Sequence, residues 1–575
     1  MLKLGKFLKP FRLSVFFVLF LVFLQSMSDL YLPTLMSDIV DKGVVTGDTH
    51  YIWEIGGFML LIAAGGMICS IFASFYSARV ASGFGKNLRS RLFSHVGQFS
   101  LQEFDKLGTA SLITRTTNDI TQVQQVLVMM LRMMASAPMM CIGGIIMAFS
   151  KDAKLTLVLA VAIPVLVIAI VIIARSGMPL FKAMQVKLDN LNRVLRENLT
   201  GIRVIRSFNR IEHEKRRFNE ANSDLMNTAI KVNKIMASMM PIMMVVLNLT
   251  TVAIVWFGGI RISNGHMQVG DMMAFIQYAM QIMFSFIMLS MMFVMIPRAS
   301  VSAVRINEVL DIVADIADPA KPVLADSKKG YVEFQDVTFS YPGAEMPAIT
   351  NISFSMKPGE ITAIIGGTGS GKSTLINLIP RFYDIDSGKI LLDGVDIREM
   401  TQEHLREKVG FVPQSAVLFT GTIAENIRFG KQEATDEEVQ QAAKISQANE
   451  FISNMPDGFN SVIAQGGTNV SGGQKQRLSI ARALVRKPEI YIFDDSFSAL
   501  DFKTDAKLRA ALKEETVDST VLIVAQRVST IMDANQIIVL DDGRIVGNGT
   551  HKQLMETSNV YREIVMSQLS EEEIA

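Results

Sequence analysis

The residues Gly366-Gly-Thr-Gly-Ser-Gly-Lys372-Ser-Thr374 follow directly on the apolar run Ile361-Thr-Ala-Ile-Ile365, and Lys372-Ser-Thr-Leu-Ile-Asn-Leu-Ile then opens a helical pattern. A strand, a glycine-rich turn and a helix in this order form a phosphate-binding loop, whose backbone N–H groups surround phosphate oxygens. We expect Lys372 to reach the β- and γ-phosphates of a nucleotide and Ser373 to bind Mg²⁺. The expected phosphate contacts are Gly366, Gly367, Thr368, Gly369, Ser370, Gly371, Lys372, Ser373 and Thr374.

Three further motifs follow this loop along the chain. Val470-Ser471-Gly472-Gly473-Gln474 begins a second helical stretch, the apolar strand Ile490-Tyr-Ile-Phe493 ends in Asp494-Asp495, and a later strand ends in Ala525-Gln526-Arg527. Because Asp494 ends a buried strand, we expect it to bind the same Mg²⁺ as Ser373. The helix that begins at Ser471 can direct its N-terminus at a phosphate.

The composition requires both a membrane-embedded and a water-soluble part. Of the 575 residues, 49% are hydrophobic and 19% are charged, and the formal net charge is only +1. The chain is too apolar for two soluble domains and too charged to lie in a membrane throughout. Cys69 and Cys141 both fall within apolar runs, where we expect no disulfide.

Six apolar stretches precede residue 300, and most approach the ~20 residues that a membrane-spanning helix needs. They are roughly residues 13–35, 56–78, 134–149, 155–174, 238–260 and 271–296. The N-terminus and the segments 79–132 and 175–237 are rich in Lys and Arg, whereas the loop 36–55 is acidic apart from Lys42. The positive-inside rule therefore places the N-terminus, both long segments and the C-terminal half in the cytoplasm.

The segments 79–132 and 175–237 contain few prolines and glycines, and leucines recur in them at helical spacing. A helical hairpin with legs of about 27 residues would reach about 40 Å into the cytoplasm. Two interpretations stay open: a solvated hairpin without function, or a lever that carries motion from the nucleotide to the membrane.

Two other features of the membrane half also leave alternatives open. Many of the 36 methionines lie in the apolar stretches, where thioethers either form adaptable walls for varied apolar ligands or fill packing gaps. Asp29 lies well inside the first stretch, where a carboxylate either recognises a cation or serves hydrogen bonding or gating near the outer end.

The composition changes between residues 311 and 330 to Asp, Ala, Pro, Lys and Ser, which is typical of a linker. We therefore predict a transmembrane domain over residues 1–310, a linker over 311–330 and a nucleotide-binding domain over 331–575. The expected fold is an all-α transmembrane domain of six long helices with cytoplasmic extensions, followed by an α/β phosphate-loop domain.

Together these motifs resemble the nucleotide-binding domain of an ATP-binding cassette (ABC) transporter, and the six spans before it resemble half of a type IV exporter. The resemblance covers nearly the whole chain and implies ATP and Mg²⁺ as cofactors. By it, Tyr341 stacks on adenine unless it is a core strand aromatic, Gln414 touches Mg²⁺, and Asp501 lies in a loop that communicates between two ATP sites. It also implies that each site combines one chain's phosphate loop with the other chain's Ser471, Gly472, Gly473 and Gln474.

The chain departs from the family pattern at two catalytic positions and at one position just before Val470-Ser-Gly-Gly-Gln474, which is the family's signature motif. The family has Glu where this chain has Asp495, His where it has Gln526, and usually Glu where it has Gln465. Asp495 is set back by roughly an ångström, which can cost ~10²-fold in rate, and Gln526 carries no positive charge at neutral pH. Neutral change in a fully active enzyme is the alternative; we expect a poorly hydrolysing site in this chain and a second, unlike half-transporter as its partner.

The resemblance implies ATP-driven export of hydrophobic or amphipathic small molecules, multidrug-like, by a multi-pass protein of the bacterial plasma membrane. The alternatives are a lipid or lipopeptide flippase and an ATP-gated channel or regulatory ABC protein. Besides the second subunit, the expected partners are a hydrophobic small-molecule substrate and membrane lipid. We expect no nucleic-acid partner, because the spans exclude a soluble ABC ATPase that acts on DNA or ribosomes.

Overall fold

The computed structural model describes residues 2–325 and 330–568, apart from the side chains of residues 2, 291, 293 and 294, so linker positions 326–329 lie outside the described residues. The chain forms two compact units. One contains residues up to 97 together with 109–312, and the other contains residues 98–108 together with those from 313 onward.

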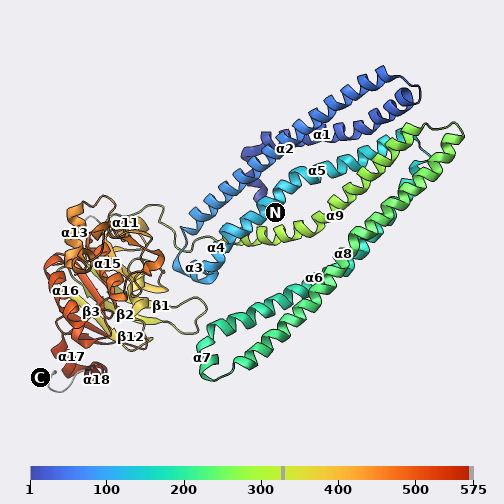
Figure 1. The fold of residues 1–575 in the computed structure, drawn as a ribbon. Coiled ribbons are helices and arrows are strands. Elements are labelled where there is room, and N and C mark those ends of the chain that lie inside the picture. Colours follow the sequence, from blue (N-terminus) through green and yellow to red (C-terminus); the bar gives the residue numbers. More distant parts are fainter. Residues whose placement is uncertain (1, 326–329, 569–575) are drawn as a thin grey trace. The chain divides into compact units, whose positions relative to one another are not determined.

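Six long helices, each apolar enough over part of its length to cross a membrane, dominate the first unit within the described ranges (Figure 1). They are α1 (Arg12–Asp38), α2 (Thr49–Val96), α5 (Ile120–Lys151), α6 (Thr156–Thr200), α8 (Ile211–Ser263) and α9 (Val269–Asp311). Shorter helical segments are η1 (Leu2–Phe11), η2 (Ile39–Val44), α4 (Thr109–Thr114), η3 (Arg115–Asp119) and α7 (Ile202–Ser207). The six predicted spans are confirmed, and the helices extend well beyond them, as the hairpin prediction required.

Polar pairs join helices that lie far apart in the sequence. The carboxylate of Asp119 is buried and accepts hydrogen bonds from Ser302 (2.8 Å) and Arg305 Nε (2.9 Å) of α9. Near the other end of α9, Asp271 accepts hydrogen bonds from Ser37 of α1 (2.9 Å) and Lys151 of α5 (2.7 Å). Because each carboxylate has its partners, these contacts tie α1, α5 and α9 into one bundle.

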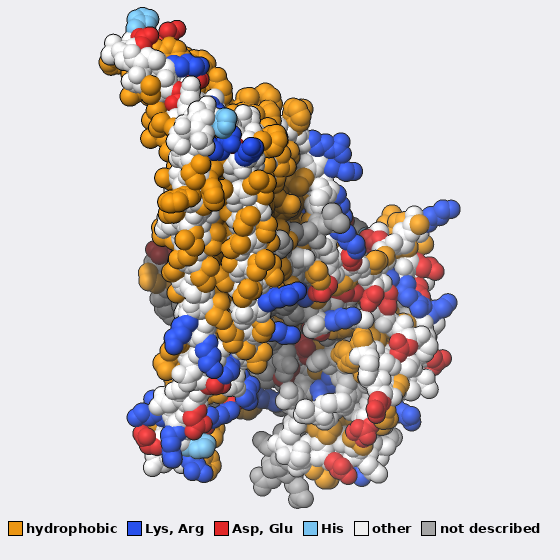
Figure 2. All heavy atoms as spheres, turned by 90° about the vertical axis from the view of Figure 1, so that its right-hand side faces the viewer, with side chains coloured by type: hydrophobic (Ala, Val, Ile, Leu, Met, Phe, Trp, Pro, Cys, Tyr) orange, Lys and Arg blue, Asp and Glu red, His pale blue; other side chains and the backbone are white. Residues whose placement is uncertain are grey.

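Helices α6 and α8 pack mainly against each other, and α7 lies at the tip of the hairpin that they form (Figure 1). No residue of α7 is buried within the unit. Hydrophobic side chains cover much of the long helices, whereas Lys, Arg, Asp and Glu gather towards the helix ends (Figure 2). Cys69 and Cys141 are both free, as expected.

The second unit contains a six-stranded sheet of order β12-β11-β3-β10-β9-β6, parallel except for β12. Its strands are β3 (Ile361–Gly366), β6 (Val409–Val412), β9 (Ile490–Asp494), β10 (Thr520–Val524), β11 (Gln536–Asp541) and β12 (Arg544–Gly549). An antiparallel sheet of order β2-β1-β4-β5 contains β1 (Val332–Phe339), β2 (Ile349–Met356), β4 (Ser387–Leu392) and β5 (Val395–Asp396). A short pair is formed by β7 (Gly421–Thr422) and β8 (Val462–Ile463).

The parallel strands are buried on both faces. Successive side chains point to opposite sides of a strand, so one strand contributes to a core on each side of the sheet. In β3, Ala363 and Ile365 join one hydrophobic core with the helices that follow β6, whereas Ile364 joins a second core with the antiparallel sheet and α10. The helices of this unit are α3 (Leu101–Leu107), α10 (Lys372–Leu378), α11 (Gln402–Glu407), α12 (Ile423–Arg428), α13 (Asp436–Ile445), α14 (Asn449–Ser453), α15 (Gly472–Leu484), α16 (Phe502–Glu515), α17 (His551–Thr557) and α18 (Asn559–Gln568). Single turns are η4 (Gly458–Asn460), η5 (Gln465–Gly467) and η6 (Val528–Thr530).

Candidate nucleotide site and membrane cavity

The glycine-rich loop lies between β3 and α10, and the backbone leaves no room for a side chain at its first and last glycines, Gly366 and Gly371. A Cβ on Gly366 would collide with the carbonyl of Leu540, and Gly371 begins α10 with a φ of 95° that favours glycine. The hydroxyl of Ser370 is buried and has no hydrogen-bond partner among the described residues. A glycine-lined cradle, a free hydroxyl and the N-terminus of α10 together fit a polyphosphate.

Lys372 lies folded across this loop. Its Nζ donates hydrogen bonds to the carbonyls of Gly366 (2.7 Å) and Gly367 (2.6 Å). Burial lowers the pKa of Lys372, although the carboxylates of Asp495 and Asp494 act in the opposite direction. The ammonium group is thus held at the loop, and its hydrogen bonds can be exchanged for bonds to phosphate oxygens.

Asp494 ends β9 with its carboxylate buried beside the loop. Burial and the charge of Asp495 raise the pKa of Asp494, whereas a hydrogen bond with Ser373 and the charge of Lys372 lower it. A hydroxyl and a carboxylate are the oxygen ligands that Mg²⁺ prefers beside nucleotide phosphates. The structure therefore brings together two of the residues that the sequence assigned to the metal.

Asp495 adopts a positive φ of 45°, an uncommon backbone conformation that is typical of functional sites. Its N–H donates to the carbonyl of Val524 (2.9 Å), which fixes the turn against the end of β10. Its carboxylate accepts hydrogen bonds from Gln526 Nε2 (2.9 Å) and Gln414 Nε2 (3.4 Å). Three candidate residues from three separate segments thus meet at one carboxylate.

Tyr341 lies just beyond the end of β1, outside the strand, and is 38% exposed. Its hydroxyl is 3.0 Å from Thr374 Oγ1 at the start of α10, and its ring makes an edge contact with Tyr383 at a centroid distance of 5.5 Å. The ring therefore lies beside the loop with an accessible face, which suits stacking on a base.

The signature residues form the start of α15. The Ser471 hydroxyl accepts a hydrogen bond from the Gln474 N–H (3.3 Å), and the Gln474 side chain accepts one from the Ser471 N–H (2.8 Å). This capping box leaves the N-terminus of α15 well ordered, and a Cβ built on Gly472 would meet no atom within 4 Å. No hydrogen bond among the described residues joins this motif to the phosphate loop of the same chain.

Asp501 similarly caps α16 through the Thr504 N–H (3.0 Å), and hydrogen bonding from that N–H lowers the pKa of Asp501.

Sequence reasoning missed Gln568, at the end of α18. Its side-chain amide donates to the carbonyl of Gln526 (2.8 Å) and accepts from the N–H of Val528 (2.8 Å). Both bonds are to backbone groups, so they hold the segment that carries Gln526. A single glutamine far along the chain gives no sequence signal of this contact.

Segment 98–108 packs within the second unit through α3. Glu103 is buried and accepts hydrogen bonds from Ser100 N–H (2.6 Å) and from the backbone N–H of Asp315 (3.1 Å). At the other end of α3, the Tyr383 hydroxyl donates to Asp105 (3.3 Å), and burial raises the pKa of Tyr383 to about 12. The tip of one predicted cytoplasmic hairpin is therefore attached to the unit that holds the phosphate loop, beside the aromatic pair of Tyr341 and Tyr383.

The first unit contains an apolar cavity of about 400 Å³ between α5, α6, α8 and α9. A single hydroxyl, that of Ser290, contributes polarity to its walls, and it donates a hydrogen bond to the Ile287 carbonyl (2.7 Å). The methionines that line this cavity are Met129, Met133, Met236, Met239, Met292 and Met295. Six of the 36 methionines thus form the walls of this cavity, while Met240, Met243 and Met244 line a separate pocket.

Comparison with known proteins identifies the family. The ABC transporter transmembrane region matches residues 15–286, and the ABC transporter domain matches residues 349–498. An uncharacterised ABC transporter ATP-binding protein of Mycobacterium tuberculosis is 43% identical over 569 residues, which cover 98% of this chain and 97% of the relative. This chain is an ABC transporter.

Two further comparisons narrow the type of transporter. A putative multidrug export ATP-binding/permease protein of Bacillus subtilis is 31% identical to the transporter over 97% of each chain. The solved structure of a bacterial Atm1-family ABC exporter with ATP bound matches with a TM-score of 0.81 at 27% identity, covering 97% of this chain and 99% of that one. The transporter therefore has the type IV exporter fold, is a multi-pass membrane protein and is a transport ATPase.

Proposed function

We propose that the transporter exports hydrophobic or amphipathic small molecules across the plasma membrane as one half of a heterodimer, and that its own phosphate loop hydrolyses ATP slowly. The observation that carries this proposal is the hydrogen bond that the side-chain amide of Gln526 donates to the carboxylate of Asp495. We further propose that residues 1–310 supply the transmembrane domain, 311–330 the linker and 331–575 the nucleotide-binding domain.

A general base for ATP hydrolysis must contact the attacking water and must accept or orient its proton. Asp495 reaches about one methylene less far than the family's Glu, and a displacement of this size can cost ~10²-fold in rate. The amide of Gln526 donates to this carboxylate, but it can neither transfer a proton nor supply a positive charge. Both changes act at the same γ-phosphate, so they weaken the same step.

The geometry of the phosphate loop and its neighbours supports a site that retains bound ATP. Lys372, Ser370 and the glycines of the loop fit the phosphates, and Tyr341 offers a ring for the base. Ser373 and Asp494, with Gln414 nearby, would hold Mg²⁺, which neutralises charge on the phosphates when it is bound. We assign these residues to binding, and Asp495 and Gln526 to the impaired hydrolysis.

The ordered cap of α15 supports a second role for the same chain. Ser471, Gly472, Gly473 and Gln474 keep the family's pattern, and their helix N-terminus is free to face a phosphate of another subunit. In a homodimer both sites would contain Asp495 and Gln526. An unlike partner that has Glu and His at these positions would instead form one competent site with this chain's signature motif.

The methionine cavity supports an apolar substrate. Flexible, polarisable thioethers adapt to ligands of different shapes, and the cavity offers few polar groups that would select one molecule. The cavity volume of about 400 Å³ lies in the range of pockets for small molecules. The similarity to a putative multidrug exporter agrees with this choice.

The decisive experiment compares ATPase activity and dye transport for the purified chain alone and for its co-expressed pair with an unlike ABC subunit. We expect the chain alone to turn over about 10²-fold more slowly than the pair. Vigorous ATPase and transport by the chain alone would overturn the heterodimer. Stimulation of the pair by phospholipid and not by dye would identify a flippase, and ionic currents in a bilayer would identify a channel.

A further inference from the structure

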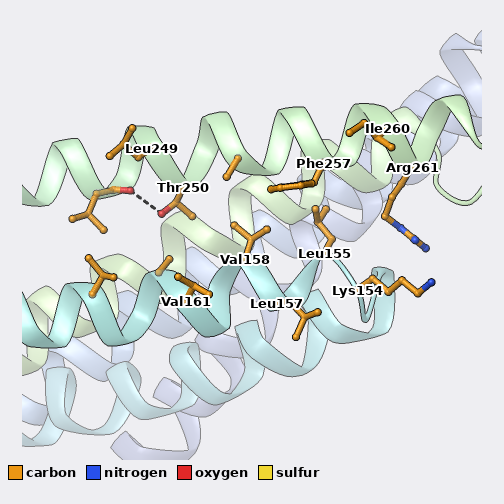
Figure 3. A pocket seen from close by; sticks show the side chains of 14 residues that line it. Lys154, Leu155, Leu157, Val158, Val161, Leu249, Thr250, Phe257, Ile260 and Arg261 are labelled. Atoms are coloured by element: carbon orange, nitrogen blue, oxygen red, sulfur yellow. Dashed lines mark hydrogen bonds between the residues drawn. The ribbon is translucent and has the colours of Figure 1, made fainter.

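An apolar groove of about 670 Å³ runs between the outer parts of α6 and α8, separate from the methionine cavity (Figure 3). Leu157 and Val161 of α6 and Leu249 of α8 line it, and each side chain is about two-thirds exposed. Thr250 also lines the groove, but its hydroxyl donates to the carbonyl of Val246 (2.7 Å). The walls therefore offer hydrocarbon and no free hydrogen-bonding group along their length.

Two cations lie at one end of this groove. Lys154 precedes α6 and Arg261 belongs to the last turn of α8, and Figure 3 shows both side chains at the same end. Arg261 forms an ion pair with Asp152, whose carboxylate is buried. The ammonium group of Lys154 has no ion pair or hydrogen bond among the described residues. One arginine, one lysine and one aspartate leave this end with a single uncompensated positive charge.

The charged end lies at the outer surface of the membrane. The connection between α5 and α6 and the one between α8 and α9 are on the side opposite to the Lys- and Arg-rich cytoplasmic segments. Cations on this side run against the usual charge distribution of a membrane protein. Lys154 is therefore placed where the headgroup of an outer-leaflet lipid meets the protein.

The length of the groove suits one acyl chain. Its lining on α8 extends from Val246 to Arg261, which corresponds to about 22 Å along a helix. One leaflet contributes about half of a hydrocarbon core that is about 30 Å thick. A lipid whose headgroup lies at Lys154 could therefore place an acyl chain along the whole leaflet depth of the groove.

We propose that this groove is a binding site for an anionic membrane lipid of the outer leaflet, with one acyl chain between α6 and α8 and the headgroup on Lys154. Arg261 contributes a second donor to the headgroup while it keeps its ion pair with Asp152. The site is distinct from the methionine cavity, and its existence does not depend on which substrate is exported.

The chain supplies a fluorescent probe for this site. Trp256 lies on α8 at helical spacing from Leu249, Ala253 and Ile260, all of which line the groove, and its side chain is 69% exposed. The only other tryptophan is Trp53. In a Trp53→Phe background, and with any tryptophans of the second subunit replaced by phenylalanine, Trp256 therefore reports alone on lipids with brominated acyl chains in nanodiscs that contain the assembled transporter.

We expect brominated phosphatidylglycerol to quench Trp256 with an association constant about fivefold higher than that of brominated phosphatidylcholine, since one basic residue is worth about that much for an anionic lipid. Lys154→Gln should reduce this ratio to about one. Lys42→Gln is the matched control, because Lys42 is also an outer cation but pairs with Asp38 and does not line the groove. Arg261 is unsuitable for the test, because its removal would leave the buried Asp152 unpaired.

Equal quenching by the two lipids in the parent protein would overturn the proposal, as would a ratio unchanged by Lys154→Gln. An equal loss with Lys42→Gln would show a general surface charge effect and would also overturn it. Protection of Trp256 from both lipids would mean that protein, such as the second subunit, covers the groove. That outcome would reject the lipid site without bearing on the proposed heterodimer.

Discussion

The carboxylate of Asp495 accepts a hydrogen bond of 2.9 Å from the Nε2 of Gln526. The resemblance to the family implies a catalytic Glu and a His at these two positions, and the two side chains of this chain contact each other directly. A change at one position therefore alters the surroundings of the other, so we expect their effects on hydrolysis to be coupled.

The first prediction concerns variants of Asp495 and Gln526 in the assembled heterodimer. Asp495→Glu alone should raise the basal ATPase rate, because it returns the carboxylate to the reach that the attacking water requires. Gln526→His alone should have a smaller effect, because the carboxylate of Asp495 still does not reach far enough to the attacking water. The double variant should exceed the product of the two single effects, and a steady-state ATPase assay on all four proteins measures this.

Asp495→Asn with and without Gln526→His serves as the control, because Asn cannot act as a base. Strict additivity in the four-protein comparison would show that the hydrogen bond between the two side chains has no role in turnover. An unchanged rate in the double variant would show that another step limits this site.

The second prediction concerns Gln568. Gln568→Ala removes two hydrogen bonds to the backbone around Gln526, each worth roughly 1 kcal/mol. Amide hydrogen exchange over residues 526–528 should therefore become at least about tenfold faster, with little change in the central strands. Gln568→Glu keeps the acceptor for Val528 but loses the donor for Gln526, so it should give an intermediate rate. Equal exchange in all three proteins would show that the C-terminal helix does not hold this segment.

The sequence was sufficient for features that are encoded within contiguous stretches. The phosphate loop, the capped start of α15 and the six spans each carry their own pattern of glycine, polar or apolar residues. The identities of Asp495 and Gln526 were also readable, because both stand at fixed positions within strong motifs, whereas their effect on hydrolysis stays a prediction.

Contacts between distant segments could not be predicted in the same way. Gln568 is an ordinary surface amide in the sequence, and only the packing of α18 brings it to Gln526, which lies 42 positions earlier. Similarly, the sequence predicted a helical hairpin over residues 79–132, but nothing in it showed that Glu103 would be buried against the N–H of Asp315. Such contacts depend on tertiary structure, which local patterns do not specify.

The third prediction concerns the pH dependence of the contact between Glu103 of α3 and Asp315. Burial alone would raise the pKa of Glu103, but its hydrogen bonds with Ser100 and Asp315 outweigh burial and lower it. Burial and the charge of Glu103 raise the pKa of Asp315. The stabilisation from Glu103 is therefore lost as the pH falls through its folded pKa, and that from protonated Asp315 is lost as the pH rises through its folded pKa.

Protection from hydrogen exchange over residues 101–107, corrected for the intrinsic effect of pH, should thus fall when acidification protonates Glu103 and also when a rise in pH ionises Asp315. Asp315→Asn should keep protection high at neutral pH, because it removes the carboxylate that faces Glu103. Asp518→Asn is the control, since Asp518 is an exposed carboxylate without an ion pair among the described residues. Identical pH profiles for Asp315→Asn and the parent would contradict the pairing.

The fourth prediction tests the methionine cavity as the substrate site. Met239→Leu conserves the apolar wall and should leave transport nearly unchanged, whereas Met239→Gln places an amide where an apolar ligand offers it no hydrogen bond. A cost of about 1–2 kcal/mol corresponds to a five- to thirtyfold higher apparent KM for substrate-stimulated ATPase. The maximal rate should change little, because the nucleotide site is untouched. Met178→Gln changes an exposed methionine of α6 that does not line the cavity, so it should preserve the apparent KM. Parallel losses in both glutamine variants would indicate general destabilisation of the helices, and an unchanged KM in Met239→Gln would place the substrate elsewhere.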